Sequence, residues 1–286
     1  MLPRPERPLS RRNLVATIAT GYVPIAIATL VIVLPLIWMI LASFKTPDEL
    51  LTQHIDVLPN SLAPTNYTDA ARTVPFGRLF LNSVLVTVVG AGIKLGLAIT
   101  TAYALVFVRF PFKRVIFALI LVTLMVPPQV SLVPNYVLIT GLGGADTYWG
   151  IILPGLATGF GTFLLRQQFM TLPGSLLEAA ELDGASHWQR LTQVVVPISI
   201  PAIATVALVN IVYEWNEYLW PLVIVSDPHM MTLPVGLTLL RNSENSAASY
   251  GILMAGTVFV IVPVLVVFSA FQRFIVSGLT QGAVKD

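Results

Sequence analysis

The chain has 286 residues, of which 56% are hydrophobic and only 10% are charged. In a water-soluble domain about a quarter of all residues are charged, so this composition excludes a soluble globular protein. The net charge of +2 is small and the basic residues are dispersed, which argues against nucleic acid as a partner. Because cysteine is absent, disulfides, thiolate metal sites and a cysteine nucleophile are also excluded.

The apolar residues are grouped into runs of about 20, the length that an α-helix needs to cross the hydrocarbon core of a bilayer. A backbone in lipid must satisfy its hydrogen bonds within its own segment or in a closed barrel, so long apolar runs indicate helices. We therefore predict an all-α polytopic membrane protein. Six transmembrane helices are expected, at residues 15–43, 80–107, 115–139, 147–168, 198–225 and 250–272.

The distribution of basic residues predicts the orientation in the membrane. With the N-terminus inside, eleven Lys and Arg residues fall in cytoplasmic segments and four fall in outer segments. Residues 1–14 are then a cytoplasmic flank, 15–272 form the six-helix domain and 273–286 form a cytoplasmic tail. No small-residue cleavage site follows the first apolar run, so we expect an anchored flank and not a cleaved signal.

Spans two and three each contain an unusual feature. Lys94 is the only basic residue well inside a span, and a lone ammonium there requires a carboxylate, carbonyl groups or an anionic substrate. The third span is interrupted by Pro127, Pro128 and Pro134, each of which removes a helical hydrogen bond. Such a break is either a structural kink or part of a helix that lines a cavity.

A polar segment between spans four and five, residues 172–197, must leave the bilayer because it is rich in charged residues. We call it the polar island. The spacing of a capping box occurs twice in it, at Ser175–Glu178 and Ser186–Gln189. Gly184 can adopt the left-handed conformation that ends a helix, and Pro197 limits the second helix. The pattern predicts a short helix, a glycine turn and a second short helix in water.

Span five is the least lipid-like of the six. Carboxylates inside a membrane normally face a water-filled route or a partner, and aromatic rings beside acids suit a sugar or polyol. Helical spacing predicts that Glu214, Glu217 and Tyr218 share one face, with Trp215 and Trp220 beside them. In the alternative, the acids pair across a subunit interface and the aromatics form an interfacial belt. The candidate pathway residues are Lys94, Asn210, Tyr213, Glu214, Glu217 and Tyr218.

The sequence lacks the motifs of the common hydrolytic sites. It has no phosphate-binding G-x-x-x-x-G-K-[ST] loop, no H-E-x-x-H zinc motif and no G-x-S-x-G nucleophile elbow. The three histidines, His54, His187 and His229, are scattered. We therefore expect no catalysis and no cofactor in this chain.

The polar island resembles the EAA loop of permease subunits in binding-protein-dependent ABC importers. The residues that carry this resemblance are Glu178-Ala179-Ala180, Asp183-Gly184-Ala185 and Val194-Val195-Val196-Pro197. The resemblance implies that Glu178, Ala179, Ala180, Asp183, Gly184, Ala185 and Pro197 couple this subunit to a cytoplasmic ATPase. Val194 and Val196 stand where isoleucine and leucine are usual in the family.

Within the carbohydrate-type importers, the chain is similar to the maltose permease group. The runs 163–173 and 215–222 look most like those of glycerol-3-phosphate or glycerophosphodiester permeases. This implies a heterodimer with a second permease, two copies of an ATPase that bind ATP and Mg, and an extracytoplasmic substrate-binding protein. From another class, the alternative is a secondary transporter driven by an ion gradient, with Glu214 and Glu217 as ion or proton carriers.

Overall fold

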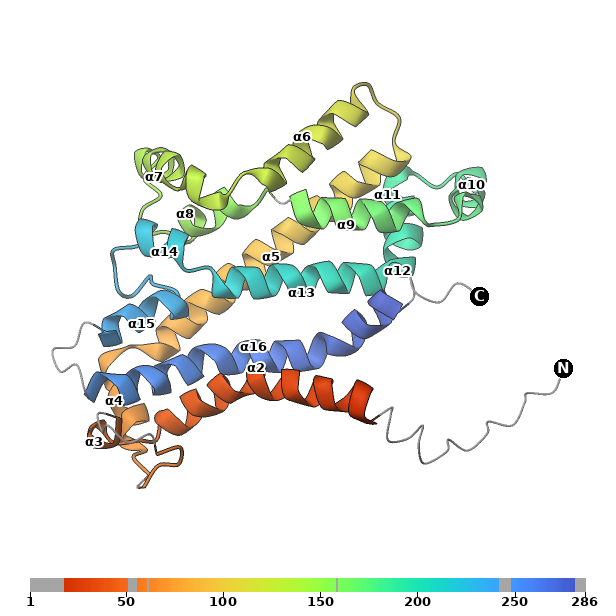
Figure 1. Cartoon of the computed structure of the whole chain (residues 1–286). Coiled ribbons are helices and arrows are strands. Elements are labelled where there is room, and N and C mark those ends of the chain that lie inside the picture. Colours follow the sequence, from red (N-terminus) through yellow and green to blue (C-terminus); the bar gives the residue numbers. More distant parts are fainter. Residues whose placement is uncertain (1–17, 51–55, 61, 158, 242–247, 281–286) are drawn as a thin grey trace. The chain divides into compact units, whose positions relative to one another are not determined.

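The structure is a computed structural model that describes residues 18–50, 56–60, 62–157, 159–241 and 248–280, so the predicted flank 1–14 lies outside the described residues. All regular secondary structure in the described part of the chain is helical, as predicted (Figure 1). The helices before the polar island are η1 (Ile18–Tyr22), α2 (Val23–Ala42), α3 (Pro47–Leu50), α4 (Thr65–Thr73), α5 (Phe76–Phe107), α6 (Lys113–Met125), η2 (Pro128–Ser131), α7 (Leu132–Gly141), α8 (Tyr148–Ile152), η3 (Leu153–Gly155) and α9 (Gly159–Met170). Those that follow are α10 (Gly174–Leu182), α11 (His187–Gln189), η4 (Arg190–Val195), α12 (Val196–Ile198), α13 (Ile200–Asn216), α14 (Leu219–Ile224), α15 (Leu233–Arg241) and α16 (Ala248–Thr280).

Three helical segments of the described chain are individually long and apolar enough to cross a membrane, namely Thr20–Ala42, Phe76–Phe107 and Tyr250–Ala270. Three further pairs of helices pass the same test together but are bent at a short break. If each bent pair is one span, the number of spans is the six that the sequence predicts. The last helix continues to Thr280, beyond the predicted end at residue 272, and 281–286 lie outside the described residues.

The third span is not one continuous helix, which confirms the predicted interruption at the prolines. The segments Lys113–Met125 and Pro128–Gly141 meet at 92°. Pro127 adopts an extended conformation, with φ −60° and ψ 131°, and Pro128 starts the 3₁₀ turn η2. A proline has no N–H to donate and its ring clashes with the carbonyl one turn back, so two consecutive prolines end the helix here.

The described chain divides into two compact units, of which the first comprises the described residues within 1–70 and 243–258. In this unit the Asn66 side chain fixes the end of α2, because its Nδ2 donates to the carbonyl oxygens of Ser43 and Lys45 at 2.9 Å each. Lys45 is itself only 1% exposed, donates from Nζ to the Asp56 carbonyl, and lies 4.7 Å from the Trp38 ring centroid.

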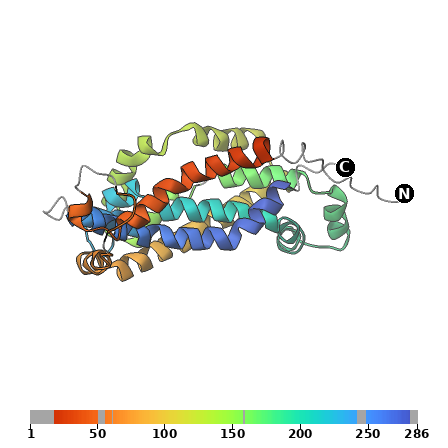
Figure 2. The ribbon, with the colours of Figure 1, turned by 60° about the horizontal axis from the view of Figure 1, so that its bottom comes forward.

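The second unit comprises the described residues within 71–242 and 259–286 and is built around α5. α5 packs along α9 and α13, and Figures 1 and 2 show these three helices side by side. Small side chains on α5, among them Ala98 and Ala102, allow this close approach. The buried core of this region consists of Ala98, Ala102, Tyr103, Leu165, Phe169, Leu191, Val195 and Val206.

We expect Gly251→Ala to destabilise the first unit. A Cβ at this position would lie 2.7 Å from Asn66 Nδ2 and 3.1 Å from the Lys45 carbonyl oxygen. The amide would have to move, which would leave buried carbonyls unpaired at a cost of about 1–3 kcal/mol. Thermal unfolding of the detergent-solubilised protein measures the effect.

Gly92→Ala is the matched control, because nothing lies within 4 Å of a Cβ there and alanine favours a helix. Equal melting temperatures for the two variants would contradict the role assigned to Asn66.

Candidate functional site

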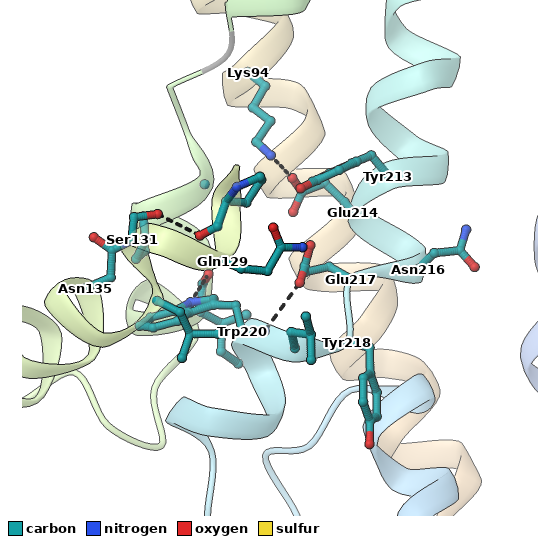
Figure 3. A pocket seen from close by; sticks show the side chains of 16 residues that line it. Lys94, Gln129, Ser131, Asn135, Tyr213, Glu214, Asn216, Glu217, Tyr218 and Trp220 are labelled. Carbon is teal, nitrogen blue, oxygen red and sulfur yellow. Dashed lines mark hydrogen bonds and ion pairs between the residues drawn. The ribbon is translucent and has the colours of Figure 1, made fainter. Parts of the chain in front are cut away.

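The second unit contains a cavity of about 390 Å³ that is lined from four stretches of the chain (Figure 3). α5 and α13 form one side, and the broken segment around η2 and α7 forms another. The residues that line it are Lys94, Pro128, Gln129, Ser131, Leu132, Asn135, Ile151, Pro154, Gly155, Tyr213, Glu214, Asn216, Glu217, Tyr218, Leu219 and Trp220. Five of the six pathway residues predicted from the sequence are among them.

Lys94 of α5 and Glu214 of α13 form an ion pair at the edge of this cavity (Figure 3). Their side chains are only 7% and 9% exposed. The Lys94 ammonium also lies 5.1 Å from the centroid of the Tyr213 ring, within the range of a cation–π contact. The sequence predicted that Lys94 needs a partner, and the structure identifies that partner as Glu214.

Two glycines leave room for this ion pair. A Cβ at Gly90 would lie 3.1 Å from Glu214 Oε2, and a Cβ at Gly155 would lie 3.3 Å from Lys94 Nζ. Both distances are shorter than an ordinary van der Waals contact, so a larger residue at either position would require the charged group beside it to shift. Neither glycine can be recognised from the sequence, because the charged groups that they face are distant along the chain.

The predicted common helical face of Glu214, Glu217 and Tyr218 is wrong. α13 ends at Asn216, and Glu217 adopts an extended conformation with φ −64° and ψ 120°. Glu217 and Tyr218 therefore lie in the break before α14, where the spacing rule for helices does not apply. They still line the cavity, because the break turns the chain along its wall.

Trp220 fixes the position of this break. Its indole Nε1 donates to the carbonyl oxygens of Gly150 at 3.1 Å and Ile151 at 3.0 Å, which joins α14 to α8. Its backbone N–H donates to Glu217 Oε1 at 3.3 Å. The Glu217 carboxylate is thus oriented by a backbone group, and no cation of the described chain neutralises it.

The broken third span supplies polar groups that sequence analysis did not single out. Gln129, Ser131 and Asn135 line the cavity opposite α13 (Figure 3). Their position follows from the prolines, because the 92° bend turns the 3₁₀ segment toward the cavity. Of the two interpretations that the sequence left open, the break lines a cavity and is not only a kink.

Asn210 and Trp215 lie outside the cavity lining. Asn210 is 5% exposed, and its Nδ2 has no hydrogen-bond partner in the described part of the chain. The Trp215 indole donates to the Val260 carbonyl at 3.1 Å and packs 5.9 Å from the Phe80 ring centroid. The prediction that Trp215 flanks the acidic residues is therefore wrong, whereas Trp220 does line the cavity.

The polar island forms two short helical segments joined by a glycine turn, as predicted. Gly184 has φ +78°, the left-handed region that only glycine adopts without strain. Ser186 and Gln189 form a capping box, with bonds of 3.3 Å and 2.8 Å between side chains and backbone. Figures 1 and 2 show α10 and α11 at the end of the second unit where α9 ends.

The other predicted capping box is absent, so the prediction for Ser175 and Glu178 is corrected. α10 starts at Gly174 directly after Pro173, and its cap has no side-chain hydrogen bond. Ser175 therefore lies inside the first turn, where its hydroxyl cannot act as the cap. The structure instead joins the two segments through an ion pair that was not predicted, between Glu181 and Arg190 at 2.9 Å.

The second segment of the island continues one residue past Pro197, to Ile198. Residues Arg190–Val195 form a wider π-helix immediately before it. That widening reduces the clash between a proline ring and the carbonyl one turn earlier. The helix then meets α13 at 85°, and this bend connects the island to the cavity wall.

The motif residues of the island are largely accessible. Glu178, Ala179, Asp183 and Gly184 are exposed, and Ala180 and Ala185 are partly exposed. Two large apolar side chains beside them are also exposed, Leu182 at 90% and Trp188 at 66%. Exposed apolar groups next to charged ones are typical of a surface that contacts another protein.

Comparison with known proteins gives one family match. Residues 92–281 match the family described as "Binding-protein-dependent transport system inner membrane component". This range includes Lys94, all of span five and the whole polar island.

Similar proteins cover nearly the full chain. The sn-glycerol-3-phosphate transport system permease protein UgpE of Agrobacterium fabrum is 31% identical over 283 residues, which cover 96% of this chain and 98% of the relative. UgpE of Pectobacterium atrosepticum is 34% identical over 267 residues, which cover 91% and 95%. A chain from the crystal structure of a bacterial ABC transporter involved in the import of the acidic polysaccharide alginate aligns with a TM-score of 0.80 and 26% identity, covering 94% of this chain and 100% of that one.

We expect the Lys94→Met, Glu214→Gln double variant to lose less stability than the sum of the losses in the two single variants. Removing one member of a buried ion pair leaves an uncompensated charge or polar group, at a cost of about 3–5 kcal/mol, whereas removing both avoids this cost. A double-mutant cycle on thermal unfolding in detergent measures the coupling.

Glu217→Gln is the control, because Glu217 forms no ion pair among the described residues. The pairing would be contradicted by strictly additive effects of the two substitutions.

Proposed function

Because the chain belongs to the family of binding-protein-dependent transport system inner membrane components, we propose that it forms half of the translocation pathway for sn-glycerol-3-phosphate or a glycerophosphodiester. The chain is a membrane-spanning permease subunit of an ABC importer, and its relatives and structural neighbour support this function over an ion-gradient carrier. The observation that carries the substrate proposal is the full-length similarity to UgpE permeases.

The cavity has a size and composition that suit a small polyol. Its volume of about 390 Å³ lies in the range of small-molecule sites. Glu217 offers a carboxylate to hydroxyl groups, and the rings of Tyr213, Tyr218 and Trp220 offer flat faces to carbon–hydrogen surfaces. We therefore assign the glycerol part of the substrate to this cavity.

The charges of the cavity disfavour a phosphate in the same position. The lining contains one cation against two carboxylates, and the cation is already paired with Glu214. A phosphate group would be repelled by Glu217 unless another subunit supplied positive charge. We propose that a second permease, the other half of a heterodimer, provides that charge.

The polar island is the proposed contact with the ATPase. Its exposed Glu178 is available to a basic residue of the ATPase, and the exposed Leu182 and Trp188 are available to an apolar groove. Gly184 sets the angle between the two segments, and the bend after Ile198 would transmit motion to α13. In this proposal Ala179, Ala180, Asp183, Ala185 and Pro197 belong to the same coupling surface.

The assembly proposed for the importer has this chain, a second permease, two ATPase subunits that bind ATP and Mg, and an extracytoplasmic substrate-binding protein. The family description refers to binding-protein dependence and to the inner membrane. The excess of basic residues in the segments assigned to the inside supports cytoplasmic termini and a cytoplasmic island.

We expect proteoliposomes of the complete complex to take up sn-glycerol-3-phosphate or a glycerophosphodiester with ATP inside, and to do so in the presence of a proton ionophore. Glu217→Gln should raise the apparent KM about tenfold, because one charge-assisted hydrogen bond to a substrate hydroxyl is lost. Initial uptake rates against substrate concentration, with sugars as competitors, test both statements.

Asn210→Leu, in the helix that precedes Glu217, is the control, because Asn210 lies outside the cavity lining and its Nδ2 has no partner among the described residues. Its KM should not change. Uptake that is abolished by the ionophore would contradict the ATP-driven mechanism, and an unchanged KM in Glu217→Gln would remove this residue from the site.

We expect Gly184→Val to uncouple ATP hydrolysis from transport. A β-branched residue at φ +78° is strained by about 1–3 kcal/mol, so the turn would change its angle. Uptake should fall while the subunits still co-purify. The measurement pairs uptake with the ATPase rate of the reconstituted complex.

Gly174→Val is the control, because Gly174 has no positive φ and the nearest group to an added Cβ is Glu178 Oε1 at 3.9 Å. Full uptake with normally stimulated ATPase in Gly184→Val would refute the coupling role of the turn.

A further inference from the structure

A second cavity of about 300 Å³ lies at the C-terminal end of α5. It is enclosed by that end of α5, the start of α6 and the end of α9. Its lining contains three cations and no acidic residue. The residues that line it are Leu105, Val106, Lys113, Arg114, Phe117, Arg166 and Met170. We call it the basic pocket. None of its residues belongs to the cavity around Lys94 or to the polar island.

Arg166 has unused hydrogen-bonding capacity in this pocket. Its guanidinium lies 4.0 Å from the centroid of the Phe117 ring, and this stacking leaves the N–H groups in the plane free. Its Nε is buried and has no hydrogen-bond partner in the described part of the chain. A buried N–H without a partner is costly, so an acceptor that is absent from this single chain is expected.

Lys113 and Arg114 add positive charge that no carboxylate in the described chain neutralises. Lys113 Nζ donates to the carbonyl oxygens of Val106 at 3.0 Å and Val108 at 3.1 Å, which holds it beside the end of α5. The same ammonium lies 5.9 Å from the centroid of the Phe110 ring. Like charges held this close repel one another, so an anion between them would remove an unfavourable interaction.

The surroundings of the pocket are those of a membrane surface. It lies where two spans meet, because only residues 108–112 separate α5 from α6, and Phe112 of this link is 76% exposed. Farther along α6, Leu124 and Met125 lie on the side of Phe117 and Arg114 and are exposed by 45% and 82%, so apolar side chains continue from the pocket along the helix. It is also at the end of α9 that leads into the polar island.

From these observations we propose that the basic pocket binds a phosphate group, and that the phosphate is the headgroup of an anionic phospholipid. The guanidinium of Arg166 matches phosphate oxygens in a bidentate manner, and Lys113 and Arg114 complete the charge. The exposed face of α6 accommodates the acyl chains. Basic pockets between transmembrane helices are suited to anionic lipid headgroups for these reasons.

The test uses the intact complex, purified through a tag on this chain and placed in nanodiscs of phosphatidylcholine with or without phosphatidylglycerol. Native mass spectrometry counts the phosphatidylglycerol that remains bound after the nanodisc is removed. We expect Arg166→Gln and Arg114→Gln to lower the bound phosphatidylglycerol about tenfold, the effect of losing one charge-assisted pair. Arg166→Lys keeps the charge and should retain more lipid than Arg166→Gln.

Arg109→Gln is the matched control, because Arg109 lies in the same link and is exposed but does not line the pocket. It should retain lipid like the unmodified chain. The melting temperature of each variant in phosphatidylcholine nanodiscs verifies that it is folded.

A second arm distinguishes the source of the phosphate. Inorganic phosphate is titrated into complexes in phosphatidylcholine nanodiscs, and the melting temperature is recorded. Stabilisation by inorganic phosphate that depends on Arg166, without retention of phosphatidylglycerol, would overturn the lipid and leave a site for the free anion. Equal lipid retention in Arg166→Gln and Arg109→Gln, with no effect of phosphate, would overturn the proposal entirely.

Discussion

The second unit depends on a buried ion pair between α5 and α13. An unpaired charge within a membrane span is expensive, so Lys94 and Glu214 hold their two helices in one relative register. Gly90 and Gly155 provide the space that this pair needs, which ties α5 to the segment before α9 as well. A membrane interior lacks the hydrophobic drive that aligns helices in water, and specific polar contacts of this kind replace it.

The cavity beside this pair is built from interrupted helices. The chain departs from α-helical geometry at Pro127–Ser131, at the 3₁₀ turn Leu153–Gly155 and at Glu217–Tyr218, and residues from all three places line the cavity. Irregular backbone exposes polar groups, and these are tolerated at membrane depth only where they are buried in protein or face water. The same breaks that weaken the helices thus supply the polar lining. Trp220 compensates for one of them through its hydrogen bonds to the Gly150 and Ile151 carbonyls.

The cavity and the polar island are connected by one helix. α13 carries Glu214 near its end, and its start meets the island's second segment at 85°. The Glu181–Arg190 ion pair links α10 to η4 across the glycine turn, with the Glu181 side chain largely exposed. The island is thus joined directly to a helix of the cavity wall.

The sequence by itself determined the features that depend on short-range interactions. Apolar run lengths predicted helical spans, Gly184 predicted a left-handed turn, Ser186 and Gln189 predicted a capping box, and Lys94 predicted a buried partner. Only the tertiary structure decided that this partner is Glu214, which is 120 residues away, because the packing of α5 on α13 brings them together. It also decided that α13 stops at Asn216, which moved Glu217 and Tyr218 into a break, and that Trp215 belongs to the core. A periodicity argument assumes that the helix continues. Where a helix ends and which neighbours its side chains meet depend on contacts between helices, and neither periodicity nor capping signals contain that information.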